Sequence, residues 1–170
     1  IRSVGWRAGW RAARHLHRDY RRGDGYSHSL VNVTLELTYK CNWKCNFCFL
    51  KDNVLNRRVD ELSFDEIARL VDRLAPAGVG FFLTGGEPFL RRDTIDIIEH
   101  IRGRGLRVGV NTNHHPLDAE KIDRLAAAPL NYLISSVHGP QAIHDAVTGI
   151  DSYDAVLRNL AHWQALKRRK

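Results

Sequence analysis

A regular alternation of short strand-like runs with amphipathic helical stripes sets the fold of this chain. The strand-like runs cover residues 31–37, 79–83, 106–110 and 132–137, and after each of them apolar residues recur every three or four positions. The runs are typical of buried strands, and the wider spacing is typical of helices with one buried face. Four strand–helix repeats predict parallel strands joined by right-handed crossovers. We therefore expect an α/β fold, a partial TIM-like barrel with four (βα) units.

The size and composition of the chain predict one globular domain. Its 170 residues, 44% of them hydrophobic, are enough to bury a sizeable core. Every apolar run is shorter than the roughly 20 residues that a membrane helix needs, so we expect a soluble protein without a transmembrane segment. The three cysteines lie within eight residues of one another, which does not fit the disulfide framework of a secreted domain. This spacing favours a reducing, cytoplasmic location.

The first 30 residues differ in charge from the rest. Seven arginines fall between residues 1 and 22, whereas acidic residues outnumber basic ones between 23 and 166, so nucleic-acid binding by the body of the protein is not indicated. Trp6, Trp10, Leu16 and Tyr20 recur at helical spacing among these arginines, which predicts a basic amphipathic helix. Such a helix can contact an anionic membrane, a nucleic acid or an acidic partner. The simplest expectation is that its aromatic face packs on the domain, and we divide the chain into a segment 1–30 and a core 31–170.

Three cysteines follow the first strand at the spacing C-x3-C-x2-C, as Cys41, Cys45 and Cys48. Thiolates this close in sequence can wrap one small metal centre. A structural zinc site needs four ligands, usually Cys or His, and a four-iron cluster normally takes four thiolates. With three cysteines in the chain, one iron of a cluster would stay open to another ligand. The alternatives are a zinc site completed by a distant histidine, or cysteines without a metal.

A second motif follows the second strand, Thr84-Gly85-Gly86-Glu87-Pro88. Two glycines at a strand end allow the backbone to approach a ligand closely, and Glu87 is an anionic acceptor beside them. Alone, this motif could be a tight turn before a proline. Together with the cysteine loop it indicates a cofactor site at the carboxyl ends of the strands, where α/β folds place their chemistry.

The two motifs, in this order and spacing, resemble the radical S-adenosylmethionine superfamily over about Val33 to Leu160. The resemblance implies an enzyme in which Cys41, Cys45 and Cys48 hold a 4Fe-4S cluster, with S-adenosylmethionine on the fourth iron. It also implies a reductant such as flavodoxin or ferredoxin, reductive cleavage of the cofactor, and radical chemistry on an unidentified substrate, a peptide or a small molecule. The alternative is a non-catalytic iron–sulfur or zinc-binding protein.

The resemblance also implies cofactor contacts. Phe47, before the last cysteine, is expected beside the adenine, which suits a flat apolar ring. Gly85, Gly86 and Glu87 are expected to receive the methionine amino group, which suits a carboxylate acceptor.

Two further strand ends contribute polar residues. Asn113 matches the family's Thr-Asn-Gly, and His114 departs from its glycine; Asn113 is either a cofactor contact or a polar strand end. Ser136 is a candidate for the ribose, and His138, in the place of the family's Asp, contacts substrate or caps the loop. The stretch 144–149 is expected to be structural.

The number of repeats carries one more expectation. The family commonly uses six strand–helix units, and four can be counted here. We therefore expect the core domain to be truncated at its carboxyl end.

Overall fold

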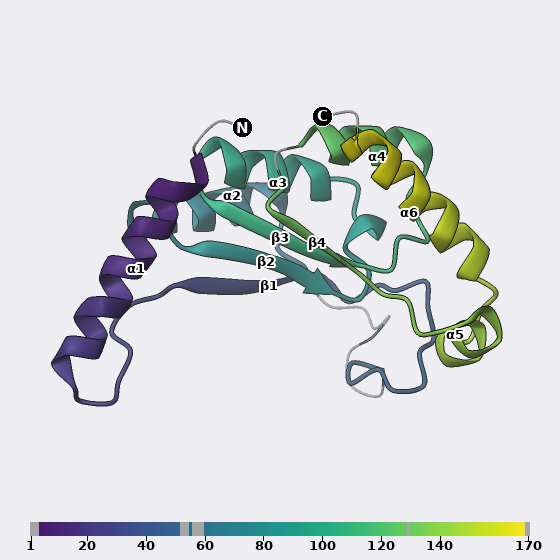
Figure 1. Cartoon of the computed structure of the whole chain (residues 1–170), viewed down its shortest axis with the longest axis horizontal. Helices are drawn as coiled ribbons and strands as arrows, with labels where there is room; N and C mark the ends of the chain where they lie inside the picture. Colours follow the sequence, from purple (N-terminus) through teal and green to yellow (C-terminus); the bar gives the residue numbers. More distant parts are fainter. Residues whose placement is uncertain (1–3, 52–54, 56–59, 129, 169–170) are drawn as a thin grey trace.

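The computed structural model describes residues 4–51, 55, 60–128 and 130–168, without the side chains of residues 4–9, 11 and 12. Its centre is a parallel four-stranded sheet in the order β1-β2-β3-β4 (Figure 1). The strands are β1 (Asn32–Thr38), β2 (Gly80–Gly85), β3 (Arg107–Thr112) and β4 (Tyr132–Ser135). The expected parallel α/β architecture with four strand–helix units is confirmed.

In the residues that the structure describes, six helices accompany the sheet. They are α1 (Val4–Arg22), α2 (Phe64–Leu74), α3 (Thr94–Gly103), α4 (Ala119–Ala127), α5 (Gln141–Thr148) and α6 (Tyr153–Arg168), and two short 3-10 turns are η1 (Ala75–Ala77) and η2 (Pro88–Leu90). Figure 1 shows α2, α3, α4 and α6 on one face of the sheet. Within the described ranges, no helix combines the length and apolar character of a membrane span.

The main core lies between the sheet and these helices. Phe81 and Leu83 of β2 are in register with Val108 and Val110 of β3, and all four side chains are fully or almost fully buried. Alternate residues of a strand point to one face, so these four form a continuous apolar layer under the helices. The in-register parallel pairing brings the carboxyl ends of the strands together, and the loops that follow them become neighbours.

The beginning of α2 is capped by Ser63. The Ser63 side chain accepts a hydrogen bond from the Glu66 N–H at 3.3 Å, and the Glu66 carboxylate accepts one from the Ser63 N–H at 2.8 Å. This reciprocal pair satisfies two amide groups that an α-helix leaves open at its first turn. Gly78, at φ 70°, then turns the chain toward β2.

Two elements differ from expectation at the fourth strand. β4 ends at Ser135 rather than Val137, and α5 forms at Gln141–Thr148, for which the sequence had predicted no helix. β4 lies at the edge of the four-stranded sheet, and Tyr132 and Ile134 on it are about half exposed.

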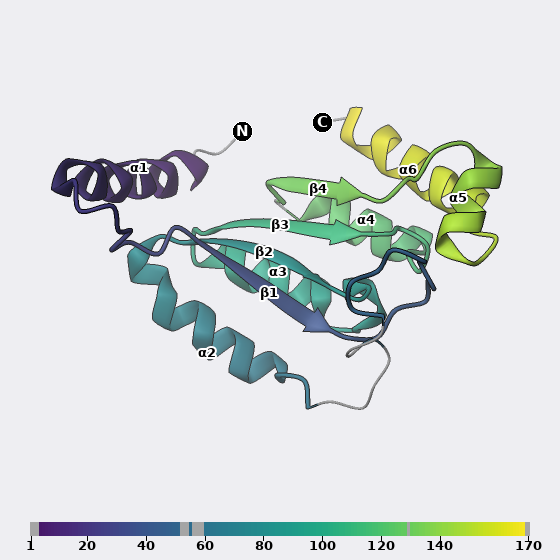
Figure 2. The same cartoon turned by 90° about the horizontal axis from the view of Figure 1, so that it is seen from below.

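The expectation that α1 packs its aromatic face on the domain is wrong for the side chains described. Trp10, Leu16 and Tyr20 are 59%, 50% and 86% exposed, and the Trp6 side chain lies outside the description. Figures 1 and 2 show α1 beyond the amino ends of the strands, at the opposite end from the cysteine loop. The Asp19 carboxylate fixes the turn that follows the helix, because it accepts a hydrogen bond from the His28 N–H at 3.0 Å.

Candidate cofactor site at the carboxyl ends of the strands

A cavity of about 160 Å³ lies at the carboxyl ends of the strands. Loops that follow all four strands contribute to it. Its lining includes every residue that the sequence predicted for the site: Cys41, Cys45, Cys48, Phe47, Gly85, Gly86, Glu87, Asn113 and Ser136. The structure therefore brings together the two motifs and the polar strand ends. It also places His138, which the sequence offered as a substrate contact or a loop cap, on the wall, and adds Trp43 and Thr112 to the lining.

The three cysteines are partly buried, and none of them forms a disulfide. Burial raises the pKa of Cys41 to about 11 and also raises the pKa of Cys45, so both are neutral thiols at pH 7 in the absence of a metal. In the described part of the chain, no three His, Cys, Asp or Glu side chains are close enough to share one metal ion. A four-iron cluster takes its cysteines on different iron atoms and does not need such convergence. Three thiols around one cavity fit this larger group.

The two glycines after β2 allow a close approach between two parts of the chain. A Cβ on Gly86 would overlap the Lys40 carbonyl oxygen and lie 3.2 Å from the Cys41 Cβ, and a Cβ on Gly85 would overlap the Thr38 carbonyl oxygen. The Gly86 N–H donates to that Thr38 oxygen at 2.7 Å. The sequence suggested that these glycines make room for a ligand. The structure shows that they make room for the chain that enters the cysteine loop.

Glu87 is almost fully buried, with 1% of its surface exposed. Its Oε1 accepts hydrogen bonds from the Phe89 N–H at 3.0 Å and the Thr112 hydroxyl at 2.8 Å, and its Oε2 accepts from the Asn113 N–H at 2.7 Å. Burial raises the pKa of Glu87 to about 7, although these hydrogen bonds act in the opposite direction. The carboxyl group thus joins the loops after β2 and β3. Its contact with a methionine amino group stays a prediction.

Asn113 connects the cysteine loop with the loop after β3. Its Nδ2 donates to the Asn42 Oδ1 at 2.9 Å, and its Oδ1 accepts from the His115 N–H at 2.9 Å. Asn42 also contacts the His115 ring nitrogen at 2.8 Å. The Asn113 amide therefore has partners in the chain at both ends, and it lines the cavity beside them.

His114 has a backbone conformation that its place in the motif requires. Its φ of 61° is in the left-handed region, where the family's glycine would fit without strain. The ring is fully buried, its Nε2 lies 2.9 Å from the Ser135 hydroxyl, and its Nδ1 has no hydrogen-bond partner in the described structure. Burial lowers the pKa of His114 to about 4. This histidine is therefore neutral, and its ring connects the end of β3 with Ser135 at the end of β4.

The far side of the cysteine loop is held by the end of α5. The Lys44 N–H donates to the Thr148 carbonyl at 2.8 Å, and the Asn46 N–H donates to the Val147 carbonyl at 3.1 Å. Gly149, at φ 70°, turns the chain there, and a Cβ on it would lie 3.2 Å from the Lys44 Cβ. The loop is thus braced by backbone contacts both from β2 and from α5.

Aromatic rings complete this second brace. The Trp43 ring meets the buried His144 ring edge-on at 5.1 Å, and the His138 ring stacks on His144 at 5.7 Å. His144 also accepts a hydrogen bond from the His138 N–H at 3.2 Å and contacts the Ser152 hydroxyl at 3.1 Å. His138 therefore stands on the cavity wall, with Phe47 on its other side at 5.1 Å. Phe47 is 62% exposed and has a ring surface available to a ligand.

Several of these supporting residues had not been predicted from sequence. Asn42 belongs to no pattern that could identify it, because its partners come from another loop. Thr112 occupies the Thr position of the Thr-Asn-Gly pattern, but its contact with Glu87 was not predicted. Trp43 carried a usable signal, since it is an apolar ring in a polar loop and proves to be 3% exposed. The segment 144–149 was expected to be structural, and the contacts of His144 and Thr148 agree with that role.

Comparison with known proteins places this arrangement in a family. The model of the radical SAM superfamily matches residues 35–169. The chain is 34% identical over 107 residues to the Fe-coproporphyrin III synthase of Methanosarcina barkeri, covering 62% of this chain and 27% of that protein. It is 35% identical over 133 residues to the PqqA peptide cyclase of Rhodopseudomonas palustris, covering 77% of this chain and 35% of that protein.

The fold comparison agrees. The crystal structure of Streptococcus suis SuiB bound to the precursor peptide SuiA aligns with a TM-score of 0.73 at 15% identity, covering 91% of this chain and 34% of that one. The chain thus spans about a third of the length of these proteins. Because the family model covers most of its residues, the chain belongs to the radical SAM superfamily.

Proposed function

We propose that this chain is the core of an enzyme that cleaves S-adenosylmethionine reductively and starts radical chemistry on a bound substrate. When bound by Cys41, Cys45 and Cys48, a 4Fe-4S cluster supplies the electron that splits the cofactor into methionine and a 5′-deoxyadenosyl radical. The observation that carries the proposal is the single cavity lined by all three thiols and by residues from every strand end. Family membership supports it.

The residues of the cavity have distinct proposed tasks. The neutral thiols of Cys41 and Cys45 would lose their protons on metal binding, as thiolate ligands require. The exposed ring of Phe47 would pack against the adenine, and Ser136 would meet the ribose. The backbone of Gly85 and Gly86 would face the methionine end. Both glycines pack closely against the backbone that enters the cysteine loop, and neither has a side chain. That part of the cavity wall is therefore backbone.

Glu87 and Asn113 are assigned both supporting and binding tasks. Both side chains have hydrogen-bond partners within the chain, and both line the cavity. A carboxylate oxygen can accept more than one hydrogen bond, so the Glu87 contacts leave room for an ammonium donor. We propose that Glu87 contributes to the methionine end and Asn113 to the adjacent wall.

The proposal extends to the setting of the enzyme. We assign residues 31–170 to the radical SAM core and residues 1–30 to a separate basic segment, and we expect a flavodoxin or ferredoxin as the reductant in the cytoplasm. The substrate is a peptide or a small molecule. The named relatives include both a peptide cyclase and an Fe-coproporphyrin III synthase, and SuiB binds a precursor peptide.

Anaerobic reconstitution with iron and sulfide tests the proposal. The reconstituted chain is incubated with S-adenosylmethionine and dithionite, and 5′-deoxyadenosine is measured by chromatography. We expect about four irons per chain and release of 5′-deoxyadenosine. Cys45→Ala should lose both, while Ser29→Ala, on the loop before β1 and outside the cavity lining, should keep both.

Two outcomes would contradict the proposal. A metal-loaded chain that leaves S-adenosylmethionine intact supports the non-catalytic alternative. Full iron loading of Cys45→Ala would remove that cysteine from the ligand set.

A further inference from the structure

The exposed side of α1 carries aromatic and aliphatic side chains, which helices of globular proteins usually bury. Trp10, Ala13, Leu16 and Tyr20 follow one another at intervals of three or four residues, so they lie along one side of the helix. Trp10, Leu16 and Tyr20 are 59%, 50% and 86% exposed. The part of this side that carries Leu16 and Tyr20 faces solvent in the described structure.

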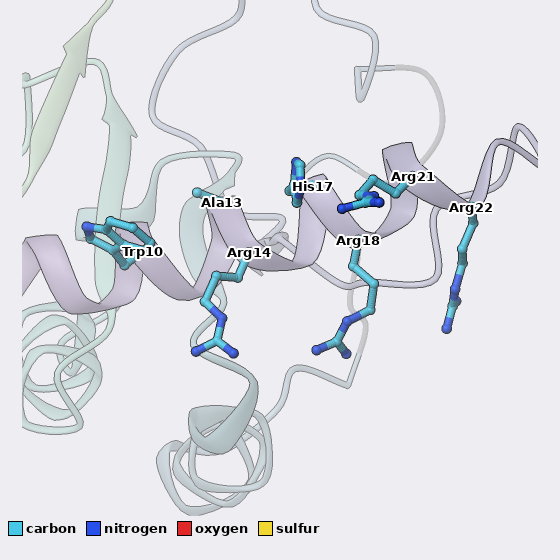
Figure 3. A pocket seen from close by; sticks show the side chains of 7 residues that line it. All are labelled: Trp10, Ala13, Arg14, His17, Arg18, Arg21 and Arg22. Atoms are coloured by element: carbon cyan, nitrogen blue, oxygen red, sulfur yellow. The ribbon is translucent and has the colours of Figure 1, made fainter.

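Arginines border this apolar side. Arg14, Arg18 and Arg22 recur every four residues, and Figure 3 shows their side chains extending in the same direction from one flank of α1. Trp10 and His17 lie on the other side of a groove of about 650 Å³. The helix thus presents a cationic row and an apolar row next to each other.

Residues 23–166 do not share the charge of α1, and the other basic run of the sequence is 167–170 at the carboxyl end. Arginines are concentrated in residues 1–22, while acidic residues outnumber basic ones between 23 and 166. An anionic surface would therefore attract this end of the molecule and not its body. The molecule would therefore approach an anionic surface with α1 facing it.

We propose that α1 lies on an anionic phospholipid membrane, with Leu16 and Tyr20 below the headgroups and Arg14 and Arg18 on the phosphates. A helix with a strong apolar side, an arginine-rich flank and low overall hydrophobicity is typical of helices that lie in the membrane interface. A nucleic acid offers negative charge but no apolar layer for Leu16. A bilayer surface offers both.

The position of α1 makes such binding compatible with the cofactor cavity. The helix lies beyond the amino ends of the strands, and the cavity lies at their carboxyl ends (Figures 1 and 2). A membrane held by α1 would face the end of the sheet opposite the cavity. Membrane binding and cofactor binding can therefore be tested separately.

Vesicle sedimentation of the full chain tests the proposal. Vesicles contain phosphatidylcholine alone, or equal parts of phosphatidylcholine and phosphatidylglycerol. We expect binding to the anionic vesicles that weakens with added salt, and binding to neutral vesicles at least tenfold weaker. Arg14→Gln/Arg18→Gln should weaken anionic binding roughly thirtyfold, since each arginine near such a surface contributes about a factor of five.

Matched variants distinguish the contributions of the apolar row and of the arginine row from a general loss of positive charge. Leu16→Ser/Tyr20→Ser keeps every arginine and should weaken binding at least tenfold. Arg73→Gln/Arg158→Gln removes the same charge from exposed positions on α2 and α6 and should bind like the unaltered chain. Circular dichroism checks that each variant is folded.

Several results would overturn the proposal. They are equal binding to both kinds of vesicle, no binding to either, and unchanged binding of Leu16→Ser/Tyr20→Ser. Binding to polyglutamate as tight as to anionic vesicles would assign α1 to an acidic protein instead. Light scattering that shows a dimer abolished by Leu16→Ser/Tyr20→Ser, without vesicle binding, would assign it to a second copy.

Discussion

The two ends of the parallel strands differ in their side chains: polar side chains are buried at the carboxyl ends, and apolar side chains are exposed at the amino ends. At the carboxyl ends, Glu87, His114 and His144 are almost completely buried, whereas at the amino ends Trp10 and Tyr20 of α1 are largely exposed. Buried polar groups need hydrogen-bond partners, and exposed apolar groups are favoured where a partner covers them. At the carboxyl ends the partners are other loops of the same chain. The comparison teaches that one end is organised internally for a ligand, and the other is arranged for an external surface.

The largest effect on stability is expected from Glu87→Ala. It leaves the N–H groups of Phe89 and Asn113 and the hydroxyl of Thr112 without their buried acceptor. A buried donor without a partner costs about 1–3 kcal/mol, so the free energy of unfolding should fall by about 3–5 kcal/mol. Denaturant unfolding measures this change. Glu120→Ala, at an exposed position, should change it by less than about 0.5 kcal/mol, and equal effects of the two would break the comparison.

The buried His114 predicts a loss of stability in acid. Its pKa is lowered from 6.5 to about 4, so the unfolded chain binds the proton more readily between these values. The stabilisation is fully present above about pH 6.5 and is lost as the pH falls toward 4, to the extent of about 3 kcal/mol.

His114→Asn should remove this contribution, because asparagine tolerates the left-handed backbone and does not titrate there. Unfolding free energies measured from pH 7 to 4 give the two slopes. Equal slopes for His114→Asn and the unaltered chain would show that the ring is not buried in solution.

Gly86→Ala tests the contact between β2 and the cysteine loop. The added Cβ overlaps the Lys40 carbonyl oxygen, so backbone must move, and overpacking of this kind costs about 1–3 kcal/mol. We also expect reduced iron loading, since Cys41 lies next to the displaced backbone. Gly103→Ala is the matched control, because a Cβ there meets nothing within 4 Å. Identical stability and iron content of both variants would contradict the close approach.

The smallest effect is expected from His144→Phe. The ring can still pack on Trp43, but the hydrogen bond from the His138 N–H and the contact with Ser152 are lost, at a cost of about 1–2 kcal/mol. The cysteine loop should release its iron to a chelator faster. His144→Gln restores polar groups and should recover part of the retention. An unchanged rate of iron release from His144→Phe would show that the contacts of His144 do not help the cysteine loop to retain iron.

The sequence predicted those parts of the fold whose determinants are local. The four apolar runs became the four parallel strands, and the cap of α2 is made by Ser63 and Glu66, three residues apart. α5 was not predicted as a helix, because His144 and Thr148 hold its buried side through polar contacts rather than an apolar stripe. The exposure of α1 was missed because an amphipathic pattern tells which side is apolar and not what covers it.

At the site, the sequence predicted which residues meet but not how each is used. Cys41, Phe47 and Ser136 line one cavity as expected. Glu87 was expected to face a ligand, and it lines the cavity, but the sequence did not predict the hydrogen bonds with Thr112 and Asn113 that the pairing of β2 with β3 allows. Such partners depend on strand order and register, which no local pattern specifies.

The contact between the cysteine loop and α5 has a consequence for the newly made chain. The hydrogen bond from Lys44 to Thr148 joins positions about a hundred residues apart. A ribosome adds about 5–20 residues per second, so roughly 5–20 s separate the synthesis of the cysteines from that of their brace. During this time the three thiols are on a loop that does not yet have its contacts with α5. Metal acquired in the final geometry must therefore arrive after translation has passed Gly149, which makes delivery of iron and sulfide a late event in maturation.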